Sequence, residues 1–139
     1  MEDDLRGRVG RISALLAEVV DHEQIREKDL REKMKRITSD RDIDERIDEN
    51  RLEQEILLYL EKLDIHEEKI RLSQHCQYFD NTITGHDSEK GKKLGFIAQE
   101  MGREINTLSS KAQYAPLQKI VVEMKVELDQ IKEQLANVL

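Results

Sequence analysis

The stretch that decides the fold spans residues 116–138 and runs PLQKIVVEMKVELDQIKEQLANV. Its apolar residues recur at alternating steps of four and three, at Leu117, Val121, Met124, Leu128, Ile131, Leu135 and Val138. This spacing puts them on one face of an α-helix, where they form a coiled-coil-like seam. Pro116 suits the first turn of such a helix, because a first-turn N–H has no partner within the helix. The sequence therefore predicts a long C-terminal helix that packs through this seam.

The first 42 residues carry two further helical patterns. Residues 2–22 place an apolar stripe on one helix face, made of Leu5, Val9, Ile12, Leu16 and Val19. Residues 23–38 are mostly charged and predict a second helix, either a solvated arm or part of a coiled coil. A break is expected within residues 38–42, where Ser and Asp favour turns.

The middle of the chain predicts two more helices separated by a loop. Residues 48–79 predict one long helix with two apolar stripes, which are Leu52, Ile56, Tyr59, Leu63 and Ile70, and Leu58, Ile65, Leu72 and Phe79. Residues 80–91 contain many turn-forming residues and predict a loop. Residues 92–109 predict a helix buried through Leu94, Ile97, Met101, Ile105 and Leu108.

The composition agrees with these periodicities. Charged residues make up 38% of the chain and aromatic residues only 4%, with one proline and no tryptophan, so a sheet would have few of the residues that favour strands. The predicted fold class is all-α, an elongated bundle of about five helices with a coiled-coil-like C-terminal helix. Because only 37% of the residues are hydrophobic, the helices have narrow apolar stripes or pack against another chain.

The net charge, the hydropathy and the single cysteine indicate which partners and which cellular compartment the protein can have. The formal net charge of −7 argues against a broadly basic nucleic-acid-binding surface but allows a locally basic groove. No apolar run reaches the roughly 20 residues that span a bilayer, and the first residues do not resemble a signal peptide. Cys76 is the single cysteine, so no internal disulfide forms, and a cytoplasmic location is expected.

A polar stripe lies between the two apolar stripes of residues 48–79. Asp64, Glu68, Arg71 and His75 fall within about 60° of one another on a helix that turns about 100° per residue. Carboxylates one turn apart can share a divalent cation, and histidine can act as a ligand or a general base. A surface ion pair between Glu68 and Arg71, worth about 0.2–0.5 kcal/mol, is the alternative explanation.

A second polar stripe lies on residues 92–109 and their flanks. It gathers Lys93, Glu100, Glu104, Thr107 and Lys111, with Phe96 and Arg103 beside it. If the two helices pack antiparallel, both stripes face one groove, and carboxylates on facing helices can hold metals. Gly91-Lys92-Lys93 could contact a phosphate at a helix start, or could simply begin that helix.

Several separated segments resemble the C-terminal domain of the YicC family of endoribonucleases. They are residues 50–55, Asp64-Ile65, Glu67-Glu68, Arg71-Leu72, His75, residues 91–96, Gln99-Glu100, Arg103-Glu104, residues 106–108, Ser110-Lys111, and Glu123, Lys125 and Leu128. The resemblance covers about residues 50–139, which we expect to form a YicC-like C-terminal helical domain. Residues 1–49 are more loosely similar to the helical region before it and are expected to form an arm or linker.

The resemblance implies a divalent-metal-dependent endoribonuclease, using Mn or Mg, that cuts single-stranded regions of RNA. It also implies ring-like homo-oligomers, expected to be hexamers, and an N-terminal domain of comparable size that this chain lacks. Many members have Asp where this chain has Gly95 and Asn where it has Gly102. A mechanism that needs a carboxylate at position 95 is therefore not expected here.

The polar stripes, combined with this resemblance, give each candidate residue an expected role. The expected metal ligands are Asp64, Glu68, Glu100 and Glu104. The expected catalytic residues are His75, Glu100 and Glu104, and the expected RNA-binding residues are Arg71, Lys93, Phe96, Arg103 and Lys111. The alternative is a helical oligomerisation or scaffold module without catalytic activity, joined through the C-terminal seam. The enzyme hypothesis requires the two polar stripes to face a shared cavity.

Overall fold

The computed structural model describes residues 1–39, 45–62, 64–112 and 114–138. Five α-helices make up these residues: α1 (Glu2–Ser39), α2 (Glu45–Lys62), α3 (His66–Thr84), α4 (Lys90–Lys111) and α5 (Ala115–Val138). The described part of the chain contains no β-strand. The all-α fold class predicted from periodicity and composition is confirmed.

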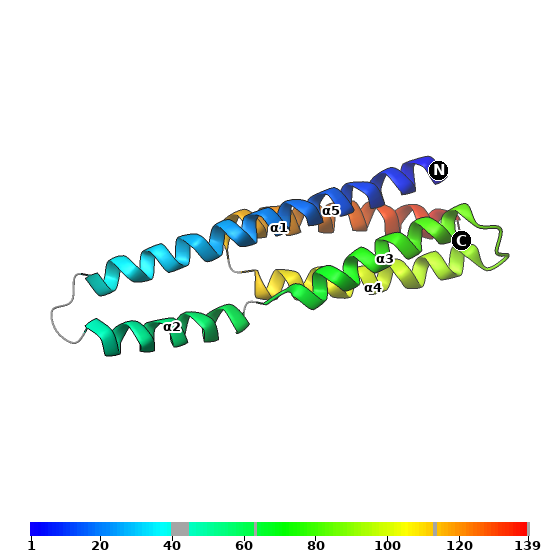
Figure 1. Ribbon diagram of the computed structural model, residues 1–139. Coiled ribbons are helices and arrows are strands. Elements are labelled where there is room, and N and C mark those ends of the chain that lie inside the picture. Colours follow the sequence, from blue (N-terminus) through cyan, green and yellow to red (C-terminus); the bar gives the residue numbers. More distant parts are fainter. Residues whose placement is uncertain (40–44, 63, 113, 139) are drawn as a thin grey trace.

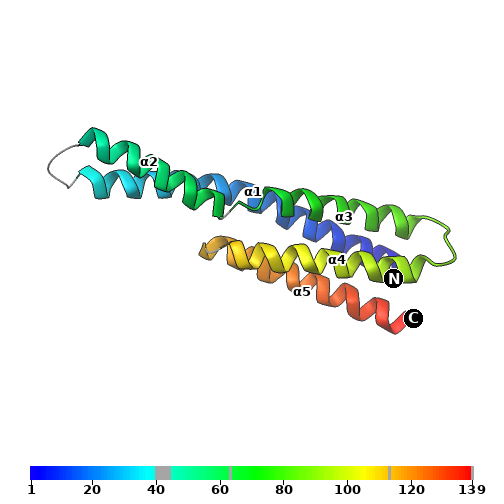
Figure 2. The same ribbon diagram turned by 90° about the horizontal axis from the view of Figure 1, so that it is seen from below.

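The molecule is an elongated four-helix bundle with a two-helix arm. The first half of α1, together with α3, α4 and α5, forms the bundle, in which α1 and α4 run one way and α3 and α5 run the other (Figure 1). Each bundle helix contacts two others, through the pairs α1–α5, α5–α4, α4–α3 and α3–α1. The second half of α1 continues past the bundle and pairs with α2 (Figure 2), and both termini lie at the opposite end. The antiparallel α3–α4 pair is the part that positions the polar stripes.

The core is built from the apolar stripes that the sequence predicted. All the stripe residues of residues 2–22 and 92–109 are buried, and so are Leu117, Val121, Met124, Leu128, Ile131 and Leu135 of α5. The side chain of Val138 lies outside the described residues. The α5 seam is covered by α1 and α4 of the same chain, so the expectation that this seam joins subunits is wrong. These two neighbouring helices bury it instead.

The first 39 residues form one helix rather than two. No proline or helix-capping pattern interrupts residues 22–23, and Gly7 and Gly10 lie inside α1 without ending it. The polar second half of α1 leaves the bundle and is joined to α2 by an ion pair between Arg31 and Glu53, with an N–O distance of 2.6 Å. Residues 23–38, for which a solvated arm or part of a coiled coil was expected, thus continue α1 beyond the bundle and pair with α2. The break expected at 38–42 falls partly on residues 40–44, which lie outside the described residues.

The long helix expected over residues 48–79 is two helices, because the chain leaves the helical path before α3. The Oδ1 atom of Asp64 accepts a hydrogen bond of 2.9 Å from the backbone N–H of His66. An aspartate that bonds two residues ahead offers the backbone an alternative to a continuing helix. Ile65, at this break, is fully buried. Leu58, in contrast, is 59% exposed on α2, so the seven-residue stripe does not continue across the break.

The loop between α3 and α4 is shorter than the predicted 80–91. Helix α3 continues to Thr84, and α4 begins at Lys90. Asp87 organises the turn, because its Oδ1 atom accepts a hydrogen bond of 2.9 Å from the N–H of Glu89 and its Oδ2 atom pairs with Lys93. This short turn fixes α3 and α4 in an antiparallel pair. In the described residues, no helix is long and apolar enough to cross a bilayer.

Candidate functional site

The two predicted polar stripes face one groove between α3 and α4. Its lining consists of Glu68, Arg71 and His75 from α3 and Glu100, Arg103, Glu104 and Thr107 from α4, around a volume of about 540 Å³. All seven residues belong to the two stripes or flank them. The antiparallel packing of α3 on α4 brings them together, because each stripe lies beside the apolar stripe of its own helix.

Glu68 is the most deeply buried acidic residue of the groove. It is only 5% exposed, and its Oε1 atom accepts a hydrogen bond of 2.7 Å from Nζ of Lys111. Nζ of Lys111 also donates to the backbone carbonyl oxygen of Asp64, at 3.2 Å. The hydrogen bond to Glu68 raises the pKa of the Lys111 amine, and desolvation opposes this shift. The Oε2 atom of Glu68 is buried and has no hydrogen-bond partner among the described residues.

The α4 side of the groove supplies two more carboxylates. Glu104 is 9% exposed, so its charge is partly removed from water. Glu100 lies closer to the groove mouth and pairs with Arg103 at an N–O distance of 3.8 Å, a weak contact because the Arg103 side chain is 76% exposed. The groove thus combines the buried carboxylates of Glu68 and Glu104 with the exposed guanidinium of Arg103 at its edge.

The α3 side supplies an imidazole and a second guanidinium. His75 is half-buried and lines the groove. Arg71 is exposed and pairs with Glu67 one turn earlier, at 3.1 Å. The alternative expectation of a Glu68–Arg71 surface pair is wrong, because the burial of Glu68 places it nearer to Lys111 than to the exposed face of α3.

Four of the expected site residues lie outside the groove lining: Lys111, which reaches Glu68, and also Asp64, Lys93 and Phe96. Asp64 precedes α3 and lines a different hollow, at the base of the arm, so the expectation that it shares a helix face with Glu68 is wrong. Lys93 is in the first turn of α4 and pairs with Asp87. Phe96 is 59% exposed on α4, which leaves its ring available to a partner.

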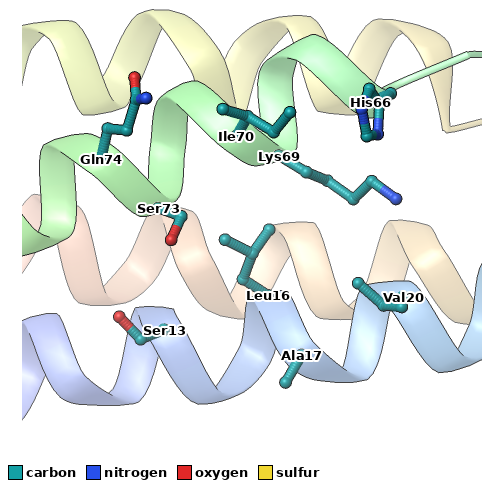
Figure 3. Close-up of a pocket in the computed structure, with 9 residues that line it drawn as sticks. All are labelled: Ser13, Leu16, Ala17, Val20, His66, Lys69, Ile70, Ser73 and Gln74. Carbon is teal, nitrogen blue, oxygen red and sulfur yellow. The ribbon is translucent and has the colours of Figure 1, made fainter.

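Another hollow of the molecule lacks the acidic groups of this groove. It lies between α1 and α3 and is lined by small and apolar side chains with His66 and Lys69 (Figure 3). Lys69 pairs with Glu23 of α1. No carboxylate lines this hollow, so the α3–α4 groove is the better candidate for acid–base or cation chemistry.

The donor set of the groove suits a divalent cation by chemistry, although its side chains are not gathered around one point. Within the described ranges, no three His, Cys, Asp or Glu side chains are grouped closely enough to hold a metal ion. The Oε2 atom of Glu68 is buried and has no hydrogen-bond partner in the described part of the chain, and Glu104 lines the same groove. Mg²⁺ commonly takes only one or two protein carboxylates and completes its shell with water and phosphate oxygens. Glu68, Glu100 and Glu104 line the groove and are carboxylates of the kind that such an ion takes, but the described side chains are not close enough together to form a metal site.

Sequence patterns missed the contact between Glu68 and Lys111. The two residues are far apart in the chain and were assigned to different roles, one to metal binding and one to RNA binding. An antiparallel register of α3 on α4 would have paired the start of α3 with the end of α4, where these residues lie. The register depends on the α3–α4 turn, whose length the sequence overestimated.

The fold and the groove define an all-helical domain that presents clustered carboxylates, an imidazole and guanidinium groups between two antiparallel helices. A family model described as "Endoribonuclease YicC-like, C-terminal" matches residues 15–139, and the chain belongs to this family. It is 44% identical over 111 residues to "Probable endoribonuclease YicC" of Clostridioides difficile (strain 630), covering 79% of this chain and 38% of that protein. It is 40% identical over 91 residues to the protein of the same name from Haemophilus influenzae, covering 66% of this chain and 31% of that protein. The match thus spans well under half the length of these relatives.

Proposed function

We propose that the chain is the cation- and RNA-binding part of a cytoplasmic endoribonuclease that cuts single-stranded RNA with the help of Mn or Mg. The observation that carries the proposal is the α3–α4 groove, which collects acidic, basic and imidazole groups in one place. The printed names of the two relatives support the reaction class. The acidic net charge is compatible with this role because two exposed guanidinium groups, those of Arg71 and Arg103, lie at the groove rim.

Each groove residue has a role that follows from its position. Glu68, Glu100 and Glu104 hold the divalent cation, which when bound would stabilise phosphate charge and lower the pKa of a coordinated water. His75 faces the same space and can move a proton to or from the attacking or leaving oxygen. Arg71 and Arg103, both exposed at the rim, contact phosphate groups of the RNA backbone.

The exposed ring of Phe96 extends this proposed surface along α4. Single-stranded nucleic acids stack their bases on exposed aromatic side chains, and such stacking is tolerant of sequence. Lys93 lies one turn earlier on α4 and adds positive charge, although Asp87 partly neutralises it. A strand that enters at the start of α4 would pass Phe96 before it reaches the groove.

The proposal is tested by removing the charge of one buried carboxylate in the groove, that of Glu104. The assay uses a chimera in which this chain replaces the matching segment of the C. difficile relative, together with a labelled single-stranded RNA and Mn²⁺. Glu104→Gln should reduce cleavage by at least about 100-fold, as expected for loss of a catalytic group. The matched control is Glu133→Gln, on the exposed side of α5, which should cleave normally. Unchanged cleavage by Glu104→Gln, Glu100→Gln and His75→Ala would remove the site assignment.

A homo-oligomer, expected to be a hexamer, remains part of the proposal, but it needs a surface other than the α5 seam. Val122 and Val126 are each more than half exposed on the outer face of α5, one turn apart. Among the described side chains of α5, they are the large apolar ones that the bundle leaves exposed. Light scattering at micromolar concentration should report a species larger than the monomer, and Val126→Glu should shift it towards the monomer if this face is used.

A further inference from the structure

We infer that Tyr78 and Phe96 form a base-stacking subsite at the turn end of the α3–α4 groove, which selects single-stranded over double-stranded RNA. The inference rests on the proposed function, because it concerns how the same groove takes its RNA. It adds Tyr78 to the RNA-binding surface and assigns the strand preference to two aromatic rings. The guanidinium groups of Arg71 and Arg103 then supply affinity for RNA of either kind.

Tyr78 and Phe96 lie at the same height on two facing helices. Tyr78 is six residues before the end of α3 and Phe96 is six residues after the start of α4, so each lies about 9 Å along its helix from the α3–α4 turn. The two helices run antiparallel and side by side from this turn (Figure 1). Tyr78 is also close enough to Lys93 of α4 to help raise the pKa of that amine, after the larger effect of its hydrogen bond to Asp87. Tyr78 therefore lies on the side of α3 that faces α4.

Both rings continue the rows of residues that line the groove. On α3, Tyr78 follows Arg71 by seven residues, and on α4, Phe96 precedes Arg103 by seven. Seven residues are close to two full turns, so each ring lies on the same helix face as its arginine. Each rim of the groove thus carries a guanidinium and, two turns nearer to the α3–α4 turn, an aromatic ring.

The two rings are exposed in a chain that has few aromatic residues. Phe79 is fully buried and Tyr114 packs against the core, whereas Tyr78 and Phe96 are 53% and 59% exposed. Single apolar side chains are common on protein surfaces, but rings that flank the same groove are typical of a surface that a ligand covers. The bundle does not need either ring for its core, so a partner is their most direct use.

The charges beside the rings favour a nucleic acid as that partner. Lys92 is exposed one turn before Phe96, and Arg103 is exposed two turns after it. Arg71 occupies the matching place on the other rim. Proteins that bind single strands combine aromatic rings, on which bases stack, with cationic groups that follow the phosphates. Positive groups on either side of a ring match the phosphates on either side of a base.

Stacking on a protein ring requires a base with a free face. Bases inside a duplex are covered by their neighbours, whereas unpaired bases can turn out and stack on Tyr or Phe side chains. Phosphates are present in both kinds of RNA, so the arginines do not distinguish them. The rings therefore provide the discrimination, and they provide it without a preference for one sequence, because every base has a π face.

The main experiment compares two RNAs on the 139-residue chain by fluorescence anisotropy at low salt, where phosphate contacts hold both. The probes are a labelled oligouridine and a labelled blunt duplex of equal length. Tyr78→Ala and Phe96→Ala should each weaken oligouridine binding at least about fivefold, as expected for loss of a stacked ring, and duplex binding less than about twofold. Arg103→Gln should weaken both alike. Unchanged oligouridine binding by Tyr78→Ala, or equal losses on the two RNAs, would overturn the inference.

Conservative variants separate stacking from general apolar contact. Tyr78→Phe keeps the ring and should bind oligouridine like the original chain, whereas Tyr78→Leu keeps an apolar side chain without a π face and should bind like Tyr78→Ala. Leu58→Ala, on α2, removes an apolar side chain as exposed as Phe96 and should change neither affinity. Full binding by Tyr78→Leu would show that the surface takes any apolar contact, as a protein-docking site would, and not a stacked base.

A second measurement reports on the subsite directly. The chain has no tryptophan, so Phe96→Trp introduces a single indole at the proposed stacking position. Saturating oligouridine should quench its fluorescence, because a stacked base lies against the indole, and saturating duplex should not. Adding Tyr78→Ala should reduce the quenching by oligouridine. An emission that is the same with oligouridine, with duplex and without RNA would show that no base reaches this position.

The outcomes also separate this inference from the proposed function. If Arg71→Gln and Arg103→Gln weaken RNA binding while the Tyr78 and Phe96 variants bind oligouridine normally, the groove binds RNA and the stacking subsite is wrong. If the ring variants lose affinity for oligouridine alone, both stand. If the unaltered chain binds neither RNA in the anisotropy assay, the proposed RNA-binding role and the subsite fall together.

Discussion

Gly102 of α4 lies directly against Leu128 of α5. A Cβ atom at position 102 would be 3.3 Å from Cδ2 of Leu128 and 3.2 Å from Nζ of Lys132. The lysine end can move, but Leu128 is buried in the core and has little room to yield. Gly95, on the same helix, has nothing within 4 Å of such a Cβ. The two glycines that distinguish this chain from many members of the resembled family therefore differ in their surroundings.

This difference predicts opposite outcomes for alanine substitution. Gly95→Ala should raise the free energy of unfolding by about 1 kcal/mol, because alanine favours the helix and meets no neighbour. Gly102→Ala gains the same helix propensity but must push Leu128, and overpacking costs about 1–3 kcal/mol. We expect no net gain or a loss at position 102. Urea unfolding of both variants measures this, and equal stabilisation at the two positions would show that α4 and α5 are not so closely packed.

The packing of α3 predicts that alanine substitution strongly destabilises the fold at one aromatic residue and hardly at all at its neighbour. Phe79 is fully buried, whereas Tyr78 is more than half exposed. Phe79→Ala should lower the free energy of unfolding by about 3–5 kcal/mol, through lost burial and the cavity left behind. Tyr78→Ala should change it by less than about 0.5 kcal/mol. Thermal denaturation followed by circular dichroism compares them, and similar melting temperatures would contradict the orientation of α3.

Cys76 should be unreactive in the folded chain. Burial between α1 and α3 raises the pKa of its thiol to about 11, although a hydrogen bond with Ser13 opposes the shift. Only the thiolate reacts readily, so a disulfide reagent at pH 8 should label Cys76 slowly until denaturant is added. Fast labelling of the native chain would show that the α1–α3 contact opens.

The same shift predicts a loss of stability at alkaline pH. The unfolded thiol ionises near pH 8.5, whereas the folded thiol keeps its proton to about pH 11. The unfolded state therefore binds fewer protons between these values, and the free energy of unfolding falls as the pH rises. Cys76→Ala should remove this part of the pH dependence. A chain and variant with parallel stability curves between pH 8 and pH 11 would contradict the shift.

The rim of the groove predicts the salt dependence of RNA binding. Arg71→Gln and Arg103→Gln should each weaken binding of single-stranded RNA and lower the slope of log affinity against log salt by about 1, as expected for loss of one phosphate contact. Arg51→Gln removes an exposed charge from α2, outside the groove, and should leave the slope unchanged. Fluorescence anisotropy over a salt series measures all three. If the unaltered chain and all three variants gave the same slope, the RNA would bind outside the groove rim.

The sequence by itself determined which faces of the helices are buried. Leu5, Leu94 and Leu117 begin stripes that are buried as predicted. The buried positions repeat with the helical period, so they can be recognised from residues that are close together in the sequence. The polar stripes were found in the same way. The position of Glu68 and Glu104 on helix faces that meet in one groove followed from periodicity and an antiparallel arrangement.

Only the tertiary structure decided which of these faces meet, and where the helices end. The helical pattern that periodicity alone would continue is interrupted at Asp64, whose side chain accepts a hydrogen bond from the backbone N–H of His66 and so offers the backbone an alternative to a continuing helix. The α5 seam could have joined two chains, but α1 and α4 cover it within one. Lys111 and Glu68 meet because a short turn fixes the register of α4 on α3. Helical period is a property of neighbouring residues, whereas partner choice depends on the packing of distant segments.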